Sequence, residues 1–276
     1  MPLQQGDVRL IKGLFIAIPT PGMIQIETTL SLCGLVANLS SRGVAHEVHY
    51  FASADIVYSR NRLAAAFLAA RKCSHILFID SDMAFDPGIV DDLATRNAEF
   101  AACDYPRRTV DFEVFRKAVE ADYELGSERR TSTADLLART AKYTFRTKAF
   151  DGSPWPFVQH EGFLSVPGVG LGLALVSRTV FERMIAAGVV DAVAPDPPKY
   201  PAETSFGFFE RARDLCSPGW LSEDLSFCRR WVVDCGGEIW IKQDTPIRHI
   251  GDFAFSGNLD RHFQALAAKS KQARKH

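Results

Sequence analysis

Two aspartates one residue apart, in Asp80-Ser81-Asp82, directly follow a short apolar run. The run from His75 to Ile79 predicts a buried strand, so the pair lies at the carboxyl end of that strand, where the backbone turns. One carboxylate can bind Mg²⁺ or Mn²⁺ while its neighbour orients a sugar hydroxyl or a metal-bound water. A chance pair of surface acids would have the same sequence, but the apolar strand before it favours a site for a cation and a diphosphate.

A second acidic pair, Glu223-Asp224, follows Ser222 at an expected helix start. Ser222 as N-cap and acids that suit the helix dipole would explain these residue types without any chemistry. The functional alternative is a general base that takes the proton from an acceptor hydroxyl. The sequence leaves both interpretations open.

His249 follows another expected strand and precedes Ile250-Gly251. A lone histidine is often structural, but an imidazole at a strand end could bind the same cation as Asp82. Mn²⁺ accepts such a mixed oxygen and nitrogen shell more readily than Mg²⁺. The glycines between Gly168 and Gly172 do not open a strand–helix unit, so a bend in a strand or close approach of the backbone to a ligand is favoured over a dinucleotide fingerprint.

Arg60, Asn61 and Arg62 fall in the first turn of a helix expected over 60–71, with Ser59 as its N-cap. This helix directly precedes the strand that carries the first acid pair. The two arginines either form a solvated face or contact a diphosphate.

The elements that position these groups alternate along the chain. Strands are expected over 10–18, 46–51, 75–79 and 99–103, and helices over 27–39, 60–71 and 87–96, the last capped by Asp86. This order predicts a doubly wound α/β layer with right-handed crossovers. Ligands of such sheets bind beyond the carboxyl ends of the strands, where the Pro19-Thr20 turn and the Asp80 pair both fall.

The second half of the chain is expected to continue the fold after an insertion. Helical patches over 111–122 and 133–142 lie in the insertion, which we expect to cover the site. Strands are then expected over 157–166, 173–176, 206–209 and 238–242, and helices over 178–187 and 220–233.

Composition narrows the class of protein. The chain has 276 residues, 47% of them hydrophobic and 24% charged, with a formal net charge of −1, so nothing in its global charge favours nucleic acid or membrane binding. No apolar run reaches ~20 residues, and the polar residues 1–9 have no signal-peptide pattern, so no membrane span and a cytoplasmic location are expected. The six scattered cysteines form no C-x-x-C pair and predict reduced core thiols rather than a zinc site.

Taken together, these residues resemble the motif set of glycosyltransferases of the GT-A fold, most closely the family-2-like bacterial and viral members. Four motifs carry the resemblance: a D-x-D at a strand end, a glycine-rich acceptor-side segment, an x-E-D at a helix start and a late histidine. They stand here as Ile79-Asp80-Ser81-Asp82, Pro167 to Gly172, Ser222-Glu223-Asp224 and His249. Arg60-Asn61-Arg62 matches an Arg-Asn-Arg helix that precedes the D-x-D, whereas the insertion 110–150 matches no family element.

The resemblance implies a mixed, mainly parallel sheet flanked by helices in a single catalytic domain, residues 1–276. Its parts would be a nucleotide-sugar half, a helical insertion, an acceptor-side half and a basic tail, at 10–108, 110–150, 151–258 and 259–276. It further implies that Asp82 and His249 bind Mn²⁺ or Mg²⁺, and that Asp80, with Ser81, contacts the ribose or the metal and its water shell.

The same resemblance assigns the substrate-facing residues. Pro19 and Thr20 would line the nucleoside pocket, and Asp55 would face the base. Asp224 would be the catalytic base of an inverting reaction, with Glu223 positioning the acceptor, whereas a retaining reaction would leave Asp224 without that role.

The expected function is therefore metal-dependent transfer of a sugar from a nucleotide sugar, a UDP-sugar, to a hydroxyl acceptor. The acceptor could be a small sugar, a lipid-linked glycan, a protein hydroxyl or a hydroxymethylated DNA base, for which Arg107-Arg108, Arg129-Arg130 and the basic tail would suit the phosphate backbone. One alternative is a phosphohydrolase of the haloacid dehalogenase type, although its D-x-D usually lies near the start of the domain. The other is a non-catalytic nucleotide-sugar-binding module. The sequence does not specify the sugar, the stereochemistry or the oligomeric state.

Overall fold

The computed structural model describes residues 11–124, 131–193, 205–251 and 254–264. The first part of the chain forms β1 (Leu14–Thr20), α1 (Ile26–Ser41), β2 (His46–Ala52), α2 (Ile56–Ala69), β3 (His75–Ile79), β4 (Met83–Ala84), α3 (Ile89–Ala94), β5 (Phe100–Cys103), α4 (Phe112–Tyr123) and α5 (Thr133–Thr140). The second part forms β6 (Gln159–His160), β7 (Phe163–Ser165), β8 (Leu173–Ser177), α6 (Arg178–Ala186), β9 (Ala192–Val193), β10 (Ser205–Phe206), α7 (Glu223–Arg229), the π-helical turn η3 (Arg230–Asp234), β11 (Trp240–Lys242), β12 (Ile247–Ile250) and β13 (Ala254–Gly257).

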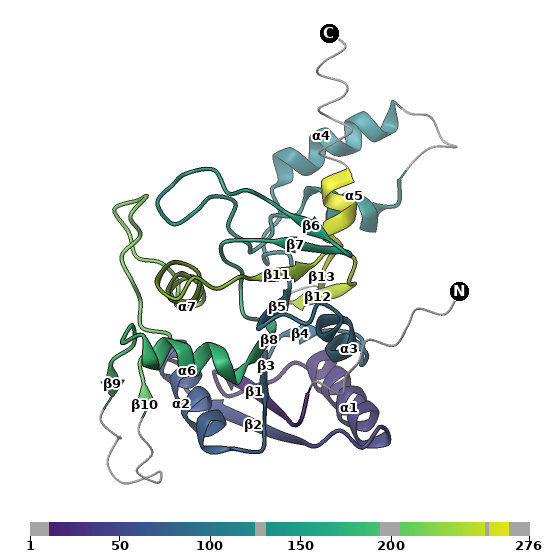
Figure 1. Cartoon of the computed structure of the whole chain (residues 1–276). Coiled ribbons are helices and arrows are strands. Elements are labelled where there is room, and N and C mark those ends of the chain that lie inside the picture. The colour runs from purple at the N-terminus through teal and green to yellow at the C-terminus, as the bar shows by residue number, and fades with distance from the viewer. Residues whose placement is uncertain (1–10, 125–130, 194–204, 252–253, 265–276) are drawn as a thin grey trace.

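Within the described residues, eight strands form one central sheet in the order β2-β1-β3-β8-β5-β11-β7-β6 (Figure 1). β1 pairs in parallel with β2 and β3, and β5 pairs in parallel with β11. β8 is antiparallel to β3 and β5, and β7 is antiparallel to β11 and β6. All strands except β8 and β7 therefore run in the same direction. The mixed, mainly parallel α/β fold expected from the sequence is confirmed.

Both faces of the central strands are buried, which explains their nearly continuous apolar sequences. Along β1, Phe15 and Ala17 face a cluster built with α2, α6 and α7, whereas Leu14, Ile16 and Ile18 face a cluster built with α1 and α3. Helices thus cover the sheet on both sides, and its carboxyl edge is left for polar residues.

The start of α2 differs from the prediction. Asp55, not Ser59, is the N-cap, because its carboxylate accepts hydrogen bonds from the backbone N–H groups of Val57 and Tyr58 at 2.9 and 3.3 Å. Arg60 therefore falls in the second turn of the helix, on a buried stretch.

Two other predicted boundaries are also wrong. Asp86 does not cap α3, because its Oδ1 accepts a hydrogen bond from Gly88 N at 2.8 Å and closes a turn before the helix begins. The strand predicted over 157–166 is a hairpin of β6 and β7, whose turn residues Glu161 and Gly162 both have positive φ, at 49° and 77°.

A second sheet has the order β13-β12-β4, and of its strands β4 directly follows the acid pair in the chain. β12 is antiparallel to β4, and this pairing sets His249 opposite Met83. The backbone N–H of Ile250 also donates a hydrogen bond to the Asp82 carbonyl at 2.7 Å. The small sheet therefore brings a late segment of the chain to the end of β3.

The two helical patches predicted in the insertion are confirmed as α4 and α5, with α4 at the outer end of the molecule (Figure 1). Hydrogen bonds link the later part of the insertion to the segment that precedes it. Arg107 N donates to the Lys142 carbonyl at 2.7 Å, and Thr144 donates from its N and Oγ1 to Asp104 Oδ1 at 3.1 and 2.6 Å. Residues 125–130, which connect α4 and α5 in the chain, lie outside the described residues.

All six cysteines are free thiols. Cys73, Cys103 and Cys228 are buried, as predicted for core thiols, but Cys33 and Cys216 are exposed, so the prediction is wrong for these two. In the parts of the chain that the structure describes, every helix is too short or too polar to cross a membrane.

Candidate active site

Asp80, Ser81 and Asp82 form the turn between β3 and β4. Two backbone hydrogen bonds from other segments fix this turn: Asp80 N donates to the Gly172 carbonyl at 2.9 Å, and Gln25 N donates to the Ser81 carbonyl at 2.8 Å. The start of β8 and the loop before α1 thus hold both carboxylates at the carboxyl end of β3.

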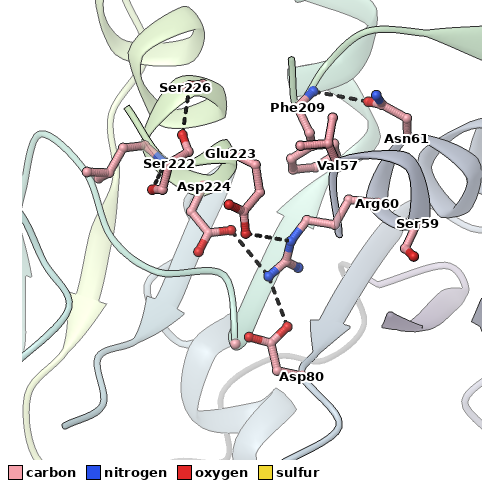
Figure 2. A network of polar contacts seen from close by, with 12 residues as sticks. Val57, Ser59, Arg60, Asn61, Asp80, Phe209, Ser222, Glu223, Asp224 and Ser226 are labelled. Atoms are coloured by element: carbon pink, nitrogen blue, oxygen red, sulfur yellow. Dashed lines mark hydrogen bonds and ion pairs between the residues drawn. The ribbon is translucent and has the colours of Figure 1, made fainter. Parts of the chain in front are cut away.

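The guanidinium of Arg60 lies buried among three carboxylates (Figure 2). Its Nη2 is 2.9 Å from Asp80 Oδ1 and 3.2 Å from Asp224 Oδ1, and its Nε is 3.7 Å from Glu223 Oε1. Burial alone would lower the pKa of Arg60, but Asp80, Asp224 and Glu223 together hold that pKa above its ordinary value. The side chain is only 1% exposed, so the solvated face considered from the sequence is wrong for Arg60.

Local structure fixes Asp224 at the first turn of α7. Ser222 is the N-cap, as predicted, and its hydroxyl accepts a hydrogen bond from Leu225 N at 3.3 Å. The backbone of Leu171, in the glycine-rich segment, lies near the Asp224 carboxyl and lowers its pKa slightly. The helix cap fixes the start of α7, from which Asp224 reaches Arg60.

The pKa of Asp224 is raised to about 7, chiefly by burial. Arg60 works against this rise, whereas the negative charges of Glu223 and Asp80 add to it. The pKa of Asp80 is also raised by burial, although Arg60 lowers it in part. A carboxyl group that titrates near neutral pH is suited to general base catalysis, so Asp224 has the protonation behaviour that this role requires.

His249 and Asp82 face one another across the turn. His249 Nε2 is 3.4 Å from Asp82 Oδ2, and His249 Nδ1 is 2.9 Å from the Pro106 carbonyl. A carbonyl can only accept, so Nδ1 carries a proton, and Nε2 is the ring nitrogen that faces the carboxylate. An imidazole nitrogen and a carboxylate oxygen placed side by side can contact the same positive charge. Arg108 Nη1, 3.0 Å from Asp82 Oδ2, supplies a positive charge from a half-exposed side chain.

This donor set fits a divalent cation that is held partly by its substrate. Among the described residues, no three His, Cys, Asp or Glu side chains converge as a complete metal site. Asp82 and His249 offer one oxygen and one nitrogen, while Asp80 Oδ1 is engaged by Arg60. Mg²⁺ sites commonly use one or two carboxylates and take further ligands from phosphates, so two protein ligands are sufficient here. Asp80 as a third direct ligand stays a prediction.

The glycine-rich segment packs closely against the side chain of Tyr105, and its approach to a ligand stays a prediction. A Cβ atom on Gly172 would lie 2.7 Å from the Tyr105 ring, and the Gly172 N–H donates to the Tyr105 hydroxyl at 3.1 Å. The same ring packs edge-on against His249, with centroids 5.1 Å apart. Tyr105 therefore links the glycine-rich segment to the imidazole.

The residues predicted to hold the nucleoside lie at the ends of β1 and β2. Pro19 and Thr20 are buried, and the Thr20 hydroxyl donates to the Met23 carbonyl at 2.6 Å, closing a local turn. Asp55 and Arg62 line one cavity of about 310 Å³ beside α2.

Arg60 and Arg62 do not share one side of α2. Two residues correspond to roughly 200° around an α-helix, so their side chains leave it in different directions. Arg60 turns to the carboxylates and Arg62 to the cavity that Asp55 also lines. A joint contact of both arginines with one diphosphate, one of the two interpretations that the sequence leaves open, does not follow from this arrangement.

Sequence reasoning missed the contribution of the segment after β5. Tyr105 packs on His249, the Pro106 carbonyl fixes its tautomer, and Arg108 pairs with Asp82. The signal that could have found them is position alone, since β5 ends at the same edge of the sheet as β3. Arg129 and Arg130, considered with Arg107 and Arg108 for nucleic acid, and the tail residues 265–276 lie outside the described residues.

Comparison with known proteins adds little to this geometry. No protein-family model and no curated protein sequence matches the chain. Among solved structures, A197 from STIV is similar, with 15% sequence identity, a TM-score of 0.46 and 91% of each chain covered. A likeness this distant carries no information about function.

Proposed function

We propose that the chain is a metal-dependent glycosyltransferase that moves a sugar from a nucleotide sugar, a UDP-sugar, to a hydroxyl acceptor. The observation that supports this most is the meeting of Asp80, from the turn after β3, with Glu223 and Asp224, from α7, on the buried Arg60. Asp80, at the expected diphosphate site, and Asp224, which is suited to accept a proton, thus belong to one cluster. In this proposal residues 1–276 form one catalytic domain, with its donor side in 10–108 and its acceptor side in 151–258.

On the donor side, Asp82 and His249 would hold Mn²⁺ or Mg²⁺, and Asp80 and Ser81 would orient the ribose. The cation, when bound, neutralises charge on the departing nucleoside diphosphate. Arg108 lies at Asp82 with a half-exposed guanidinium, so it can move to the diphosphate and add a charge-assisted hydrogen bond there.

On the acceptor side, Asp224 takes the proton of the acceptor hydroxyl as its oxygen forms a bond to the anomeric carbon. The bond from that carbon to the diphosphate oxygen breaks, and its electron pair leaves with the diphosphate. This single displacement inverts the anomeric carbon, and Glu223 positions the acceptor. The pKa of about 7 that burial gives Asp224 supports this role.

A screen of nucleotide sugars for released nucleoside diphosphate, with calorimetry of UDP and Mn²⁺ binding, tests the proposal. Asp82→Ala is expected to abolish both UDP binding and UDP release while the circular dichroism spectrum is unchanged. Asp86→Ala, an acid-to-alanine change at an exposed position four residues away, is the matched control and should behave as the wild type.

Three results would contradict the proposal. An Asp82→Ala protein with full activity would remove the metal role. Hydrolysis of p-nitrophenyl phosphate without any nucleotide-sugar chemistry would favour the phosphohydrolase, and UDP binding without transfer or hydrolysis would favour a binding module. Offering glycans and hydroxymethylated duplex DNA as acceptors, with a gel shift at two salt concentrations, separates the two acceptor classes.

A further inference from the structure

The buried guanidinium of Arg60 contacts residues that lie far apart in the sequence. Arg60, on α2, contacts Asp80 after β3 and the two acids at the start of α7. Its Nη2 is shared between carboxylates at 2.9 and 3.2 Å. In the proposed reaction these carboxylates belong to opposite sides, because Asp80 faces the donor and Asp224 faces the acceptor.

The cluster is incompletely hydrogen-bonded as it stands. Arg60 Nε and Nη1 are buried and have no hydrogen-bond partner within the described residues, and Asp224 Oδ1 has only its ion-pair contact with Nη2 at 3.2 Å. Nε lies 3.7 Å from Glu223 Oε1, only slightly beyond hydrogen-bond distance. Buried polar groups without partners carry a free-energy cost, so tighter contacts of this guanidinium with α7 would be favourable.

We infer that Arg60 is a positioning residue that transmits donor binding to the acceptor base. This inference rests on the proposed function. When donor and cation occupy the turn after β3, the Asp80 carboxylate shares its charge with them and holds Arg60 less strongly. The guanidinium then closes on Glu223 and Asp224 and fixes the Asp224 carboxylate for the acceptor. Burial of all but 1% of the Arg60 side chain favours this role over direct contact with a diphosphate.

Arg60→Lys is the appropriate variant, because lysine keeps the charge but cannot span several carboxylates with a rigid planar fork. Arg178→Lys is its matched control. Arg178 also donates several hydrogen bonds, to the carbonyls of Phe67, Leu68, Ala70 and Cys73, but these lie at the other end of α2. Arg178→Lys therefore measures the effect of replacing a hydrogen-bonded arginine with lysine at a position away from the acid cluster.

The first measurement is hydrogen exchange by mass spectrometry, with and without UDP and Mn²⁺. In the wild type and in Arg178→Lys, the ligands should change exchange both in the peptide that contains Asp80 and in the peptide of α7. In Arg60→Lys the first change should persist and the α7 change should disappear. If Arg60→Lys does not fold, Glu223→Ala removes the acceptor toward which Nε would move, and the same loss of the α7 response is expected.

The second measurement is kinetic. Arg60→Lys should lower kcat for transfer by about 100-fold, the cost expected for a misplaced catalytic group, while the Kd for UDP with Mn²⁺ changes less than about threefold. A wild-type kcat, or an unchanged α7 response, would overturn the inference. So would weaker binding of UDP with unchanged binding of uridine, because that result assigns Arg60 to the diphosphate. A wild type that binds UDP but transfers no sugar would refute the proposed function, yet the exchange experiment would still decide the role of Arg60.

Discussion

Asp224→Asn should change activity and stability in opposite directions. The substitution keeps the shape of the side chain but removes the group that accepts the proton in the proposed reaction. General base catalysis contributes typically about 10²–10⁴-fold, so kcat/KM for transfer should fall by that factor. In the wild type the activity should rise with pH as Asp224 loses its proton near its pKa of about 7, and this rise should be absent from the residual activity of the variant.

The stability effect follows from the raised pKa. Below the ordinary pKa of 3.8 the carboxyl is protonated in both the folded and the unfolded chain, and it adds no pH dependence. Between that value and about 7 the unfolded chain ionises first, so the wild type loses stability as pH rises and then levels off. Each pH unit is worth about 1.4 kcal/mol, which gives a total loss on the order of 4 kcal/mol. Asparagine does not ionise, so the variant escapes this loss.

Two assays measure these opposite effects. Released UDP at pH 5 to 9 gives the rate profile, and urea unfolding at pH 4 and pH 8 gives the free energy of unfolding. We expect the variant to match the wild type at pH 4 and to exceed it by a few kcal/mol at pH 8. A variant that is less stable than the wild type at pH 8 would refute the burial argument, and a fully active variant would refute the base assignment.

Two further substitutions test the other parts of the site. His249→Ala should weaken Mn²⁺-dependent UDP binding by at least about tenfold in calorimetry, since even partners behind a metal ligand contribute 10–100-fold to metal affinity; an unchanged Kd would exclude His249 as a ligand. Gly172→Ala should lower the free energy of unfolding by about 1–3 kcal/mol, because its Cβ would meet the Tyr105 ring at 2.7 Å. The companion change Tyr105→Leu should relieve part of that loss, and purely additive effects in urea unfolding would contradict the contact.

Patterns among neighbouring residues correctly predicted several helices and strands. The apolar runs of β1 and β3 reflect burial on both faces of the sheet, and the Ser222 cap depends on neighbouring residues alone. The cap of α2 shows the limit of such signals. Asp55 and Ser59 are both acceptable caps, and the local sequence does not decide between them.

The arrangement of the candidate site depends on contacts that no local pattern encodes. Arg60 could be taken for a surface residue until α7 brings two acids to it from more than 160 positions along the chain. Tyr105 and Pro106 act through a ring edge and a backbone carbonyl, neither of which has a motif. The pairing of β12 with β4, which sets His249 beside Asp82, is likewise a long-range choice.

The position of β8 has a consequence for synthesis of the protein on the ribosome. β8 lies between β3 and β5, although it follows β5 by about 70 residues in the chain. When residues 1–108 have emerged, β3 and β5 cannot yet pair with their shared neighbour, and their apolar edges are exposed. Non-local strand pairing of this kind is slow and leaves partly folded chains prone to aggregation. We therefore expect residues 10–108 not to form an independent folding unit, and a nascent chain stalled before β8 to be a substrate for chaperones.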